Sequence, residues 1–396
     1  DGGVDVTALT FDMSAAGAAT FNAGATFKNA GVIQANRADN ARNIQLFNDN
    51  NFGTIQTSSD PIKISSQVYT RFDVGGTEMF RISSDGSLST PTAGTSNVRF
   101  GVNAGDSITS GGNFNVVVGD EAGTALTTAD KSTAVGYNAL AAATTNGNNT
   151  AVGANALGAT TGIANTAVGE GAMETNVAGT LNVAIGANSL DADTTGSKSV
   201  AVGYASLSSQ NFTTATDTFN TAVGYEAGTA ITTGVNNVLI GGLTGDAITD
   251  ADNNTAIGNA ALSANTVGSQ MTAVGAGALN SVNPATATDM WNVAVGVNAG
   301  LSVTTGTQNT YIGGLAGDAA TASVENVAVG YQALSADTLG SKSVAVGRMA
   351  LLSQNQTTAT DVYNVAVGHN AGQQVTTGVN NTLIGGLAGD ALTDAD

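Results

Sequence analysis

The sequence predicts an all-β protein built as a parallel β-solenoid, a rod of stacked coils. Three observations carry this prediction: a strand-like tetrapeptide ending in glycine recurs along the chain, glycine is abundant, and large side chains are few. Of 396 residues, 52 are Gly and 3 are Pro, while aromatic residues make up 5%. Such a composition cannot fill one thick core, but it can fill many thin layers of small side chains.

The repeat is marked by a glycine that follows Val or Ile, usually with Ala one position earlier. A turn between strands needs a positive φ or a close backbone approach, and glycine allows both, so we interpret these residues as structural turns. None lies in a phosphate-binding pattern such as GxGxxG. The sixteen repeat glycines are Gly119, Gly136, Gly153, Gly169, Gly186, Gly203, Gly224, Gly241, Gly258, Gly275, Gly296, Gly313, Gly330, Gly347, Gly368 and Gly385.

The spacing of these glycines predicts coils of two lengths. Most gaps are 17 residues, and three gaps are 21 residues, so one long coil and three short coils form a super-repeat of 72 residues. We expect two short strands in each coil. Because adjacent strand residues face opposite sides, Ala points inward and Val or Ile outward. An outward apolar row in every coil needs a cover, and the simplest one is two further copies of the chain, which predicts a homotrimer.

The chain divides into three segments. Residues 95–396 form the repeat, which we expect to continue beyond residue 396. Residues 1–36 contain short strand-like runs separated by small turns, typical of a β-structured shaft or adaptor. Residues 37–94 predict a small β-rich module with four strands, in the runs IQLF, IKIS, VYTRFDV and EMFRIS, and with turns at Gly75-Gly76 and Asp85-Gly86.

Charge and composition exclude several classes of partner. From residue 101 onward there are 21 acidic and only 4 basic residues, which disfavours binding to nucleic acid. No apolar run approaches the roughly 20 residues of a membrane helix, so no membrane insertion is expected. The chain has no cysteine, so it has no disulfide or cysteine-based metal site. No cofactor is predicted.

The candidate binding residues are aromatic. Phe219, Trp291 and Tyr363 recur at intervals of 72, each after the four extra residues of a long coil. Aromatic rings on protruding loops can stack on sugar rings; alternatively, each ring covers the neighbouring coil. A second set directly follows the repeat glycine and forms either a contact stripe or a row of amphipathic side chains on a solvated face: Tyr137, Tyr204, Tyr225 and Tyr331, with Arg348 and His369 at the same place.

The carboxylates predict neither catalysis nor a metal site. Asp250, Asp252 and Asn254 have a spacing that calcium would accept, but the segment is not repeated in the middle super-repeat, and capping of turns by Asp explains it better. Asp120 and Glu121 are adjacent, so they face opposite ways on a strand. The chain has one histidine. We therefore predict no enzymatic activity.

The repeats NTAVGANAL, NVAIGANSL, SVAVGYASL and NVAVGYQAL resemble the head repeats of trimeric autotransporter adhesins and, more closely, repeats of bacteriophage tail fibres, over residues 101–396. The resemblance implies a left-handed parallel β-roll packed as a trimer, located on a virion tail or an extracellular appendage, that contacts a host surface glycan or protein. The coils are longer than those of adhesin heads, and no coiled-coil stalk is visible, which favours the phage hypothesis. A bacterial trimeric adhesin or extracellular filament subunit is the alternative. A depolymerase and an ice-binding protein are more remote hypotheses.

Overall fold

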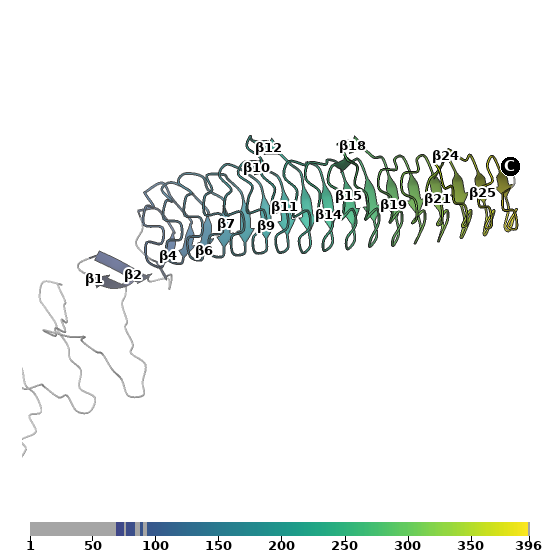
Figure 1. Ribbon diagram of the computed structural model, residues 1–396. Helices are drawn as coiled ribbons and strands as arrows, with labels where there is room; N and C mark the ends of the chain where they lie inside the picture. Colours follow the sequence, from purple (N-terminus) through teal and green to yellow (C-terminus); the bar gives the residue numbers. More distant parts are fainter. Residues whose placement is uncertain (1–68, 75–76, 84–87, 90–92, 395–396) are drawn as a thin grey trace, which may run out of the picture. The chain divides into compact units, whose positions relative to one another are not determined.

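The computed structural model describes residues 69–74, 77–83, 88–89 and 93–394. Within these residues there is no helix, and hence none that could cross a membrane. From residue 98 the chain forms a parallel β-solenoid of about 17 turns (Figure 1). The prediction of an all-β parallel solenoid is therefore confirmed.

The main sheet is a ladder with one three-residue strand from each coil. Each strand pairs in parallel with the strand of the next coil, so that equivalent residues stack: Ala201 lies between Ala184 and Ala222. The strands are β4 (Val98–Phe100), β5 (Val116–Val118), β6 (Thr133–Val135), β7 (Thr150–Val152), β8 (Thr166–Val168), β9 (Val183–Ile185), β11 (Val200–Val202), β13 (Thr221–Val223), β14 (Val238–Ile240), β15 (Thr255–Ile257), β17 (Thr272–Val274), β19 (Val293–Val295), β20 (Thr310–Ile312), β21 (Val327–Val329), β23 (Val344–Val346), β25 (Val365–Val367) and β26 (Thr382–Ile384).

The prediction of two strands in every coil is wrong for most coils. Among residues 93–394, a second strand forms only where a long coil meets the coil before it. The rest of each coil alternates through left-handed residues such as Asn138 (φ 55°) and Leu140 (φ 54°), which no extended strand contains. These turns still bond from coil to coil, since the Leu140 N–H donates to the Ala156 carbonyl at 3.0 Å. The neighbouring coils thus hold a conformation that costs about 1–2 kcal/mol per residue in isolation.

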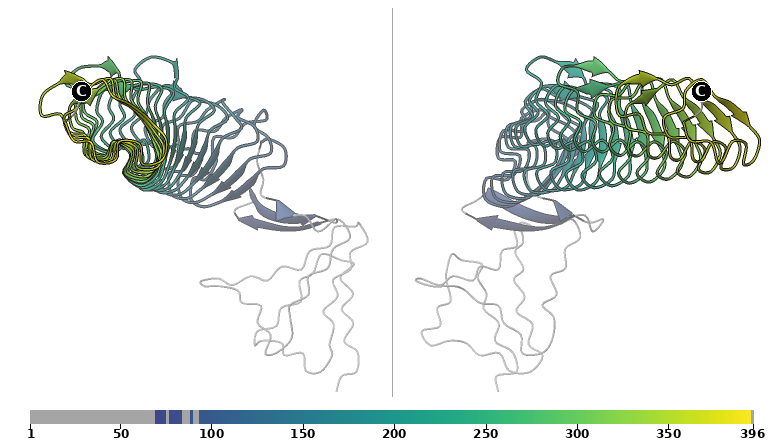
Figure 2. Two further views of the ribbon diagram at one scale, coloured as in Figure 1. Left: turned by 90° about the vertical axis from the view of Figure 1, so that its right-hand side faces the viewer. Right: turned by 45° about the vertical axis from the view of Figure 1, so that its right-hand side comes forward.

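The short second strands form three parallel pairs, all on the same side of the solenoid (Figure 2). The pairs are β10 (Gly196–Ser197) with β12 (Thr216–Asp217), β16 (Gly268–Ser269) with β18 (Thr288–Asp289), and β22 (Gly340–Ser341) with β24 (Thr360–Asp361). Each pair joins the extra residues of a long coil to the preceding coil. The candidate aromatic residues lie two residues after the ends of β12, β18 and β24.

The core is a stack of thin layers. The inward Ala of nearly every strand is completely buried, as is a Leu or Met four residues after most repeat glycines. Where a strand carries a large inward residue, glycine replaces that Leu both in the same coil and in the coil before it. Tyr311 is fully buried, and a Cβ on Gly300 would lie 2.9 Å from the Tyr311 ring. Large and small side chains are therefore exchanged between layers, which keeps the packing dense.

The repeat glycines stack on one another along the whole ladder. Their φ values run from 129° to 145°, a region that side chains other than glycine rarely adopt. A Cβ on Gly258 would lie 2.6 Å from the carbonyl carbon and oxygen of Gly275 in the next coil. The column thus marks a line of close approach between successive backbones.

A column of buried asparagines runs beside the strands, four residues before the repeat glycines. In a typical coil, the Asn237 Nδ2 donates to the Ala251 carbonyl at 2.8 Å and its Oδ1 accepts from the Asn254 N–H at 3.0 Å. Each amide therefore closes its own coil and binds the next, which satisfies buried polar groups. The buried members are Asn97, Asn115, Asn149, Asn165, Asn182, Asn220, Asn237, Asn254, Asn292, Asn309, Asn326 and Asn364.

Before the solenoid lies a three-stranded antiparallel sheet formed by β1 (Tyr69–Val74), β2 (Thr77–Ser83) and β3 (Leu88–Ser89). The first two strands agree with those predicted from VYTRFDV and EMFRIS. Phe72 and Phe80 are paired in this sheet, with ring centroids 5.3 Å apart. The predicted segment at 1–36 and the earlier strands of 37–94 lie outside the described residues.

Candidate functional site

The three loop aromatics occupy equivalent places on one edge of the solenoid, five residues before a repeat glycine. Phe219, Trp291 and Tyr363 all have left-handed backbones, with φ of 50°, 53° and 54°. These residues are 52%, 54% and 51% exposed. Each ring is therefore neither buried against the neighbouring coil nor fully exposed to solvent. The left-handed backbone turns each ring out of the coil.

Each aromatic lies beside two polar residues, and we call each group of three a corner. The first corner is Lys198, Asp217 and Phe219; the middle corner is Gln270, Asp289 and Trp291; the third corner is Lys342, Asp361 and Tyr363. The short strand pairs produce this arrangement, because they place the Asp beside the serine that precedes the Lys or Gln. A corner is thus built from two successive coils.

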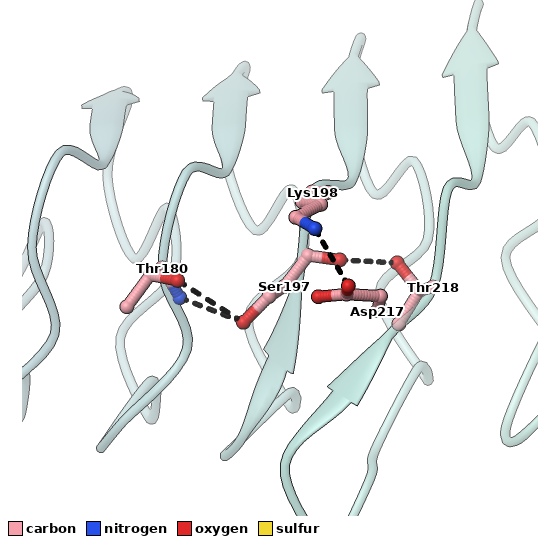
Figure 3. A network of polar contacts seen from close by, with 5 residues as sticks. All are labelled: Thr180, Ser197, Lys198, Asp217 and Thr218. Atoms are coloured by element: carbon pink, nitrogen blue, oxygen red, sulfur yellow. Dashed lines mark hydrogen bonds and ion pairs between the residues drawn. The ribbon is translucent and has the colours of Figure 1, made fainter.

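The first corner is closed by an ion pair. The Lys198 Nζ lies 2.6 Å from the Asp217 Oδ2 and 5.1 Å from the centre of the Phe219 ring. Figure 3 shows the lysine bridging from its own coil to Asp217 on the next, beside the bond that Thr218 donates to the Ser197 carbonyl. The Thr180 N–H donates to the Ser197 Oγ at 3.0 Å, so three coils are tied together here.

The third corner repeats this geometry. The Lys342 Nζ lies 2.7 Å from the Asp361 Oδ2 and 5.3 Å from the centre of the Tyr363 ring. The Tyr363 hydroxyl donates to the same carboxylate at 3.4 Å. The hydrogen bond to Asp361 raises the pKa of Lys342, and the same bond lowers the pKa of Asp361.

The middle corner has the same backbone but is open. Gln270 replaces the lysine, and no cation lies over the Trp291 ring among the described residues. Within the same part of the chain, the side chains of Gln270 and Asp289 make no hydrogen bond or ion pair. By the register of β16 with β18, Gln270 and Asp289 occupy the positions that the lysine and the aspartate hold beside the ring in the outer corners. The bonding capacity of both side chains is unused.

The interior beneath the corners differs in the same way. Beneath the first corner, the buried Asp193 accepts from the Gly196 N–H at 3.0 Å and from the Gln210 Nε2 at 2.6 Å, and Gln210 also donates to the Ser199 Oγ at 3.0 Å. Asp337, Ser343 and Gln354 repeat this network beneath the third corner.

Beneath the middle corner, the equivalent positions are Asn265, Met271 and Val282. Asn265 closes on a single residue, Gly268, by accepting from its N–H and donating to its carbonyl, both at 2.8 Å. Met271, Val282 and Met290 are buried. The middle corner thus rests on an apolar interior and the outer two on polar networks.

The second predicted set of aromatics lies in the turns that follow the ladder strands, directly after the repeat glycines. Tyr137, Tyr204, Tyr225 and Tyr331 are all exposed. Only Tyr204 and Tyr225, which lie on successive coils, stack, with ring centroids 5.6 Å apart and planes at 14°. A hydrogen bond with Glu226 raises the pKa of Tyr225.

At the same place on two later coils, the Arg348 Nη1 lies 3.5 Å from the His369 Nε2. Among the described residues, the side chains that follow the repeat glycines therefore make two contacts between successive coils, Tyr204 with Tyr225 and Arg348 with His369. They form no continuous aromatic stripe.

The candidate calcium ligands do not converge. Asp252 accepts from the Val235 N–H of the preceding coil at 2.7 Å, a bond between coils and not the local turn cap that was expected. Asn254 is buried in the asparagine column, and Asp250 is exposed. Across the described residues, no three histidines or carboxylates lie close enough to hold a metal ion. Of the adjacent acids Asp120 and Glu121, which were considered as catalytic residues, Glu121 accepts a hydrogen bond from the Asn103 Nδ2 at 2.8 Å.

Sequence reasoning found the three aromatics but missed their partners. Lys198, Gln270 and Lys342 also recur at intervals of 72, and this spacing was the signal that could have found them. The sequence alone could not place these three residues beside the aromatic of the next coil, because that placement depends on the register of the short strand pairs.

Comparisons with protein-family models, curated proteins and solved structures find no match to this chain.

Proposed function

We propose that the chain is a structural, non-catalytic part of a homotrimeric fibre, of a phage tail or a comparable appendage, that spaces and presents surfaces for attachment to a host cell. In this proposal the coils are left-handed, as the resemblance implies. A stack of about 17 coils with a rise of about 4.8 Å each is a rod about 80 Å long. Such a rod suits spacing better than it suits enclosing a substrate.

The observation that carries the proposal is the outward apolar row of the ladder. Each ladder strand from β5 onward places a Val or Ile immediately before its glycine on the outside, and these side chains are partly or largely exposed, as with Ile312 at 39%. The row runs the full length of the solenoid, and a surface of this kind is a typical interaction site. Identical chains side by side would cover it with the same coil spacing throughout, which favours further copies of this chain.

Host attachment is the second part of the proposal. With 21 acidic and 4 basic residues after position 100, an anionic glycan would be repelled. A neutral surface glycan, bound by exposed aromatic rings, suits this surface best.

The test of the fibre is the solution mass of the purified chain. We expect a mass of three chains at micromolar concentration. Ile312→Asp, in the outward row, should shift the mass to that of one chain, because burying three unpaired carboxylates in one interface is strongly unfavourable. Thr305→Asp, an exposed position outside the ladder strands, is the matched control and should remain trimeric. A parent chain that is folded yet monomeric would refute the trimer.

A further inference from the structure

We propose that the middle corner, formed by Gln270, Asp289 and Trp291, is a binding subsite for an uncharged pyranose ring, and that the first and third corners are closed forms of the same corner. This inference rests on the attachment function proposed above and names the part of the surface that performs it. It also separates three aromatics that the sequence treats as equivalent.

The first argument is the ring itself. Trp291 is the only tryptophan of the chain, and its side chain is 54% exposed. Indole has the largest flat apolar face of any side chain, and the apolar face of a pyranose packs on such a surface. At the outer corners a lysine ammonium lies 5.1 Å and 5.3 Å from the ring centres, so a sugar would have to displace a cation.

The second argument is the unused bonding capacity beside the ring. A sugar presents neighbouring hydroxyl groups, each both a donor and an acceptor. The Asp289 carboxylate accepts only, whereas the Gln270 amide both donates and accepts. At the outer corners the equivalent carboxylates are engaged by lysine at 2.6 Å and 2.7 Å. Only the middle corner offers an aromatic platform together with free polar groups.

The third argument is rigidity. Trp291 stands between Met290, which is buried, and Asn292, a member of the asparagine column. The Asn292 Nδ2 donates to the Gly306 carbonyl at 2.7 Å, and its Oδ1 accepts from the Asn309 N–H at 2.9 Å. In the loop before β18, Pro284 restricts the backbone further. A preformed platform loses less conformational entropy when it binds.

The charge of the corner selects the class of sugar. Asp289 has no neutralising cation among the described residues, so an acidic sugar would meet a bare carboxylate. Neutral hexoses, N-acetylhexosamines and their oligomers carry no such penalty. Each contact is weak, and in a trimer three copies of the corner would add avidity where the glycan spans them.

The test uses Trp291 as its own reporter. The intact chain is titrated with neutral mono- and oligosaccharides and with sialylated forms of the same sugars, while tryptophan fluorescence is recorded. We expect a saturable change with at least one neutral sugar and at least tenfold weaker binding of its sialylated form. No saturable change with any neutral sugar, or equal binding of both forms, would overturn the inference.

The sharpest variant is Gln270→Lys, which installs the residue found at both outer corners. It should close the corner and weaken binding at least tenfold, with an unchanged melting temperature. The matched control is Asn253→Lys, because Asn253 is exposed and occupies the position equivalent to Gln270 in the preceding coil. This variant adds the same charge where no aromatic ring lies beside it, and it should bind the sugar as the parent does. Parental binding by Gln270→Lys would refute the proposed geometry.

The outcomes separate this inference from the fibre proposal. A trimeric chain without a saturable fluorescence change retains the fibre and loses the subsite. A monomeric chain with a saturable change for a neutral sugar retains the subsite and loses the trimer.

Discussion

The middle corner and its two neighbours share a backbone and a register but differ in nearly every side chain that meets there. On the surface, Lys198 and Lys342 correspond to Gln270; in the interior, Gln210 and Gln354 correspond to Val282. Surface and interior change together, although the lysines do not contact the buried network. The comparison shows that one coil geometry can carry two alternative sets of side chains.

The buried residues beneath a corner must change together, from the polar set to the apolar set, for a physical reason. A buried carboxylate such as Asp193 is tolerable only while donors surround it. If Gln210 becomes apolar, the carboxylate loses the Nε2 donor at 2.6 Å, and nothing nearby replaces it. The middle corner avoids the charge by using Asn265, whose amide is satisfied by Gly268 alone. Mixed sets therefore leave a buried polar group unpaired.

The largest loss of stability is expected from a substitution in the column of repeat glycines, which all coils share whatever kind of corner they carry. Gly258→Val should destabilise the chain by at least about 3 kcal/mol, because the new Cβ would lie 2.6 Å from the Gly275 backbone and the φ of 135° is strained for any other residue. Thermal unfolding followed by circular dichroism measures the loss.

The control for this substitution is Gly385→Val. Gly385 has a φ of 129°, but a Cβ there would meet only the Ala388 Cβ, at 3.9 Å. In a chain that is expressed to end at Asp396, this substitution keeps the backbone strain and lacks the clash. Equal losses of stability in the two variants would show that the close approach between coils contributes nothing.

An intermediate effect is expected from mixing the two interior sets. Gln210→Val should destabilise the chain by about 2 kcal/mol, because the buried Asp193 carboxylate loses its side-chain donor and keeps only backbone donors. Adding Asp193→Asn, Ser199→Met and Thr218→Met rebuilds the middle set and should recover more than half of the loss. Chemical unfolding of the single and combined variants measures both quantities.

Additivity is the outcome that would contradict this account. If the four substitutions together destabilise the chain by the sum of their separate effects, the residues are not coupled, and the exchange between super-repeats has no energetic basis. Val282→Gln in the parent serves as the reciprocal variant, since it buries an amide within the apolar set and should also destabilise.

Much of this solenoid could be predicted from sequence, but not all of it. The inward Ala and outward Val follow from the alternation of strand residues. The second strand of each coil was predicted wrongly, because left-handed residues such as Leu140 are held by hydrogen bonds from neighbouring coils, and local propensity does not contain that information. The partners of the corner aromatics could not be predicted for a related reason. The contact of Lys198 with Asp217 follows from the register of β10 with β12, which the sequence does not state.

The smallest effect concerns the ion pair that closes the third corner. Lys342→Gln should raise the pKa of Asp361 toward its ordinary value of 3.8, because the hydrogen bond from Lys342 is the main cause of its lowering. Since the folded-state pKa is depressed, the pair stabilises the fold above the ordinary pKa of Asp and loses this contribution as the pH falls through the folded-state value. The Asp361 side chain is half exposed, so salt should weaken the effect. Carboxyl NMR titration at low and high salt measures it, with Lys131→Gln as the control. If Lys342→Gln leaves the Asp361 titration unchanged at low salt, the lysine does not close the corner in solution, and the difference between the outer and middle corners disappears at the surface.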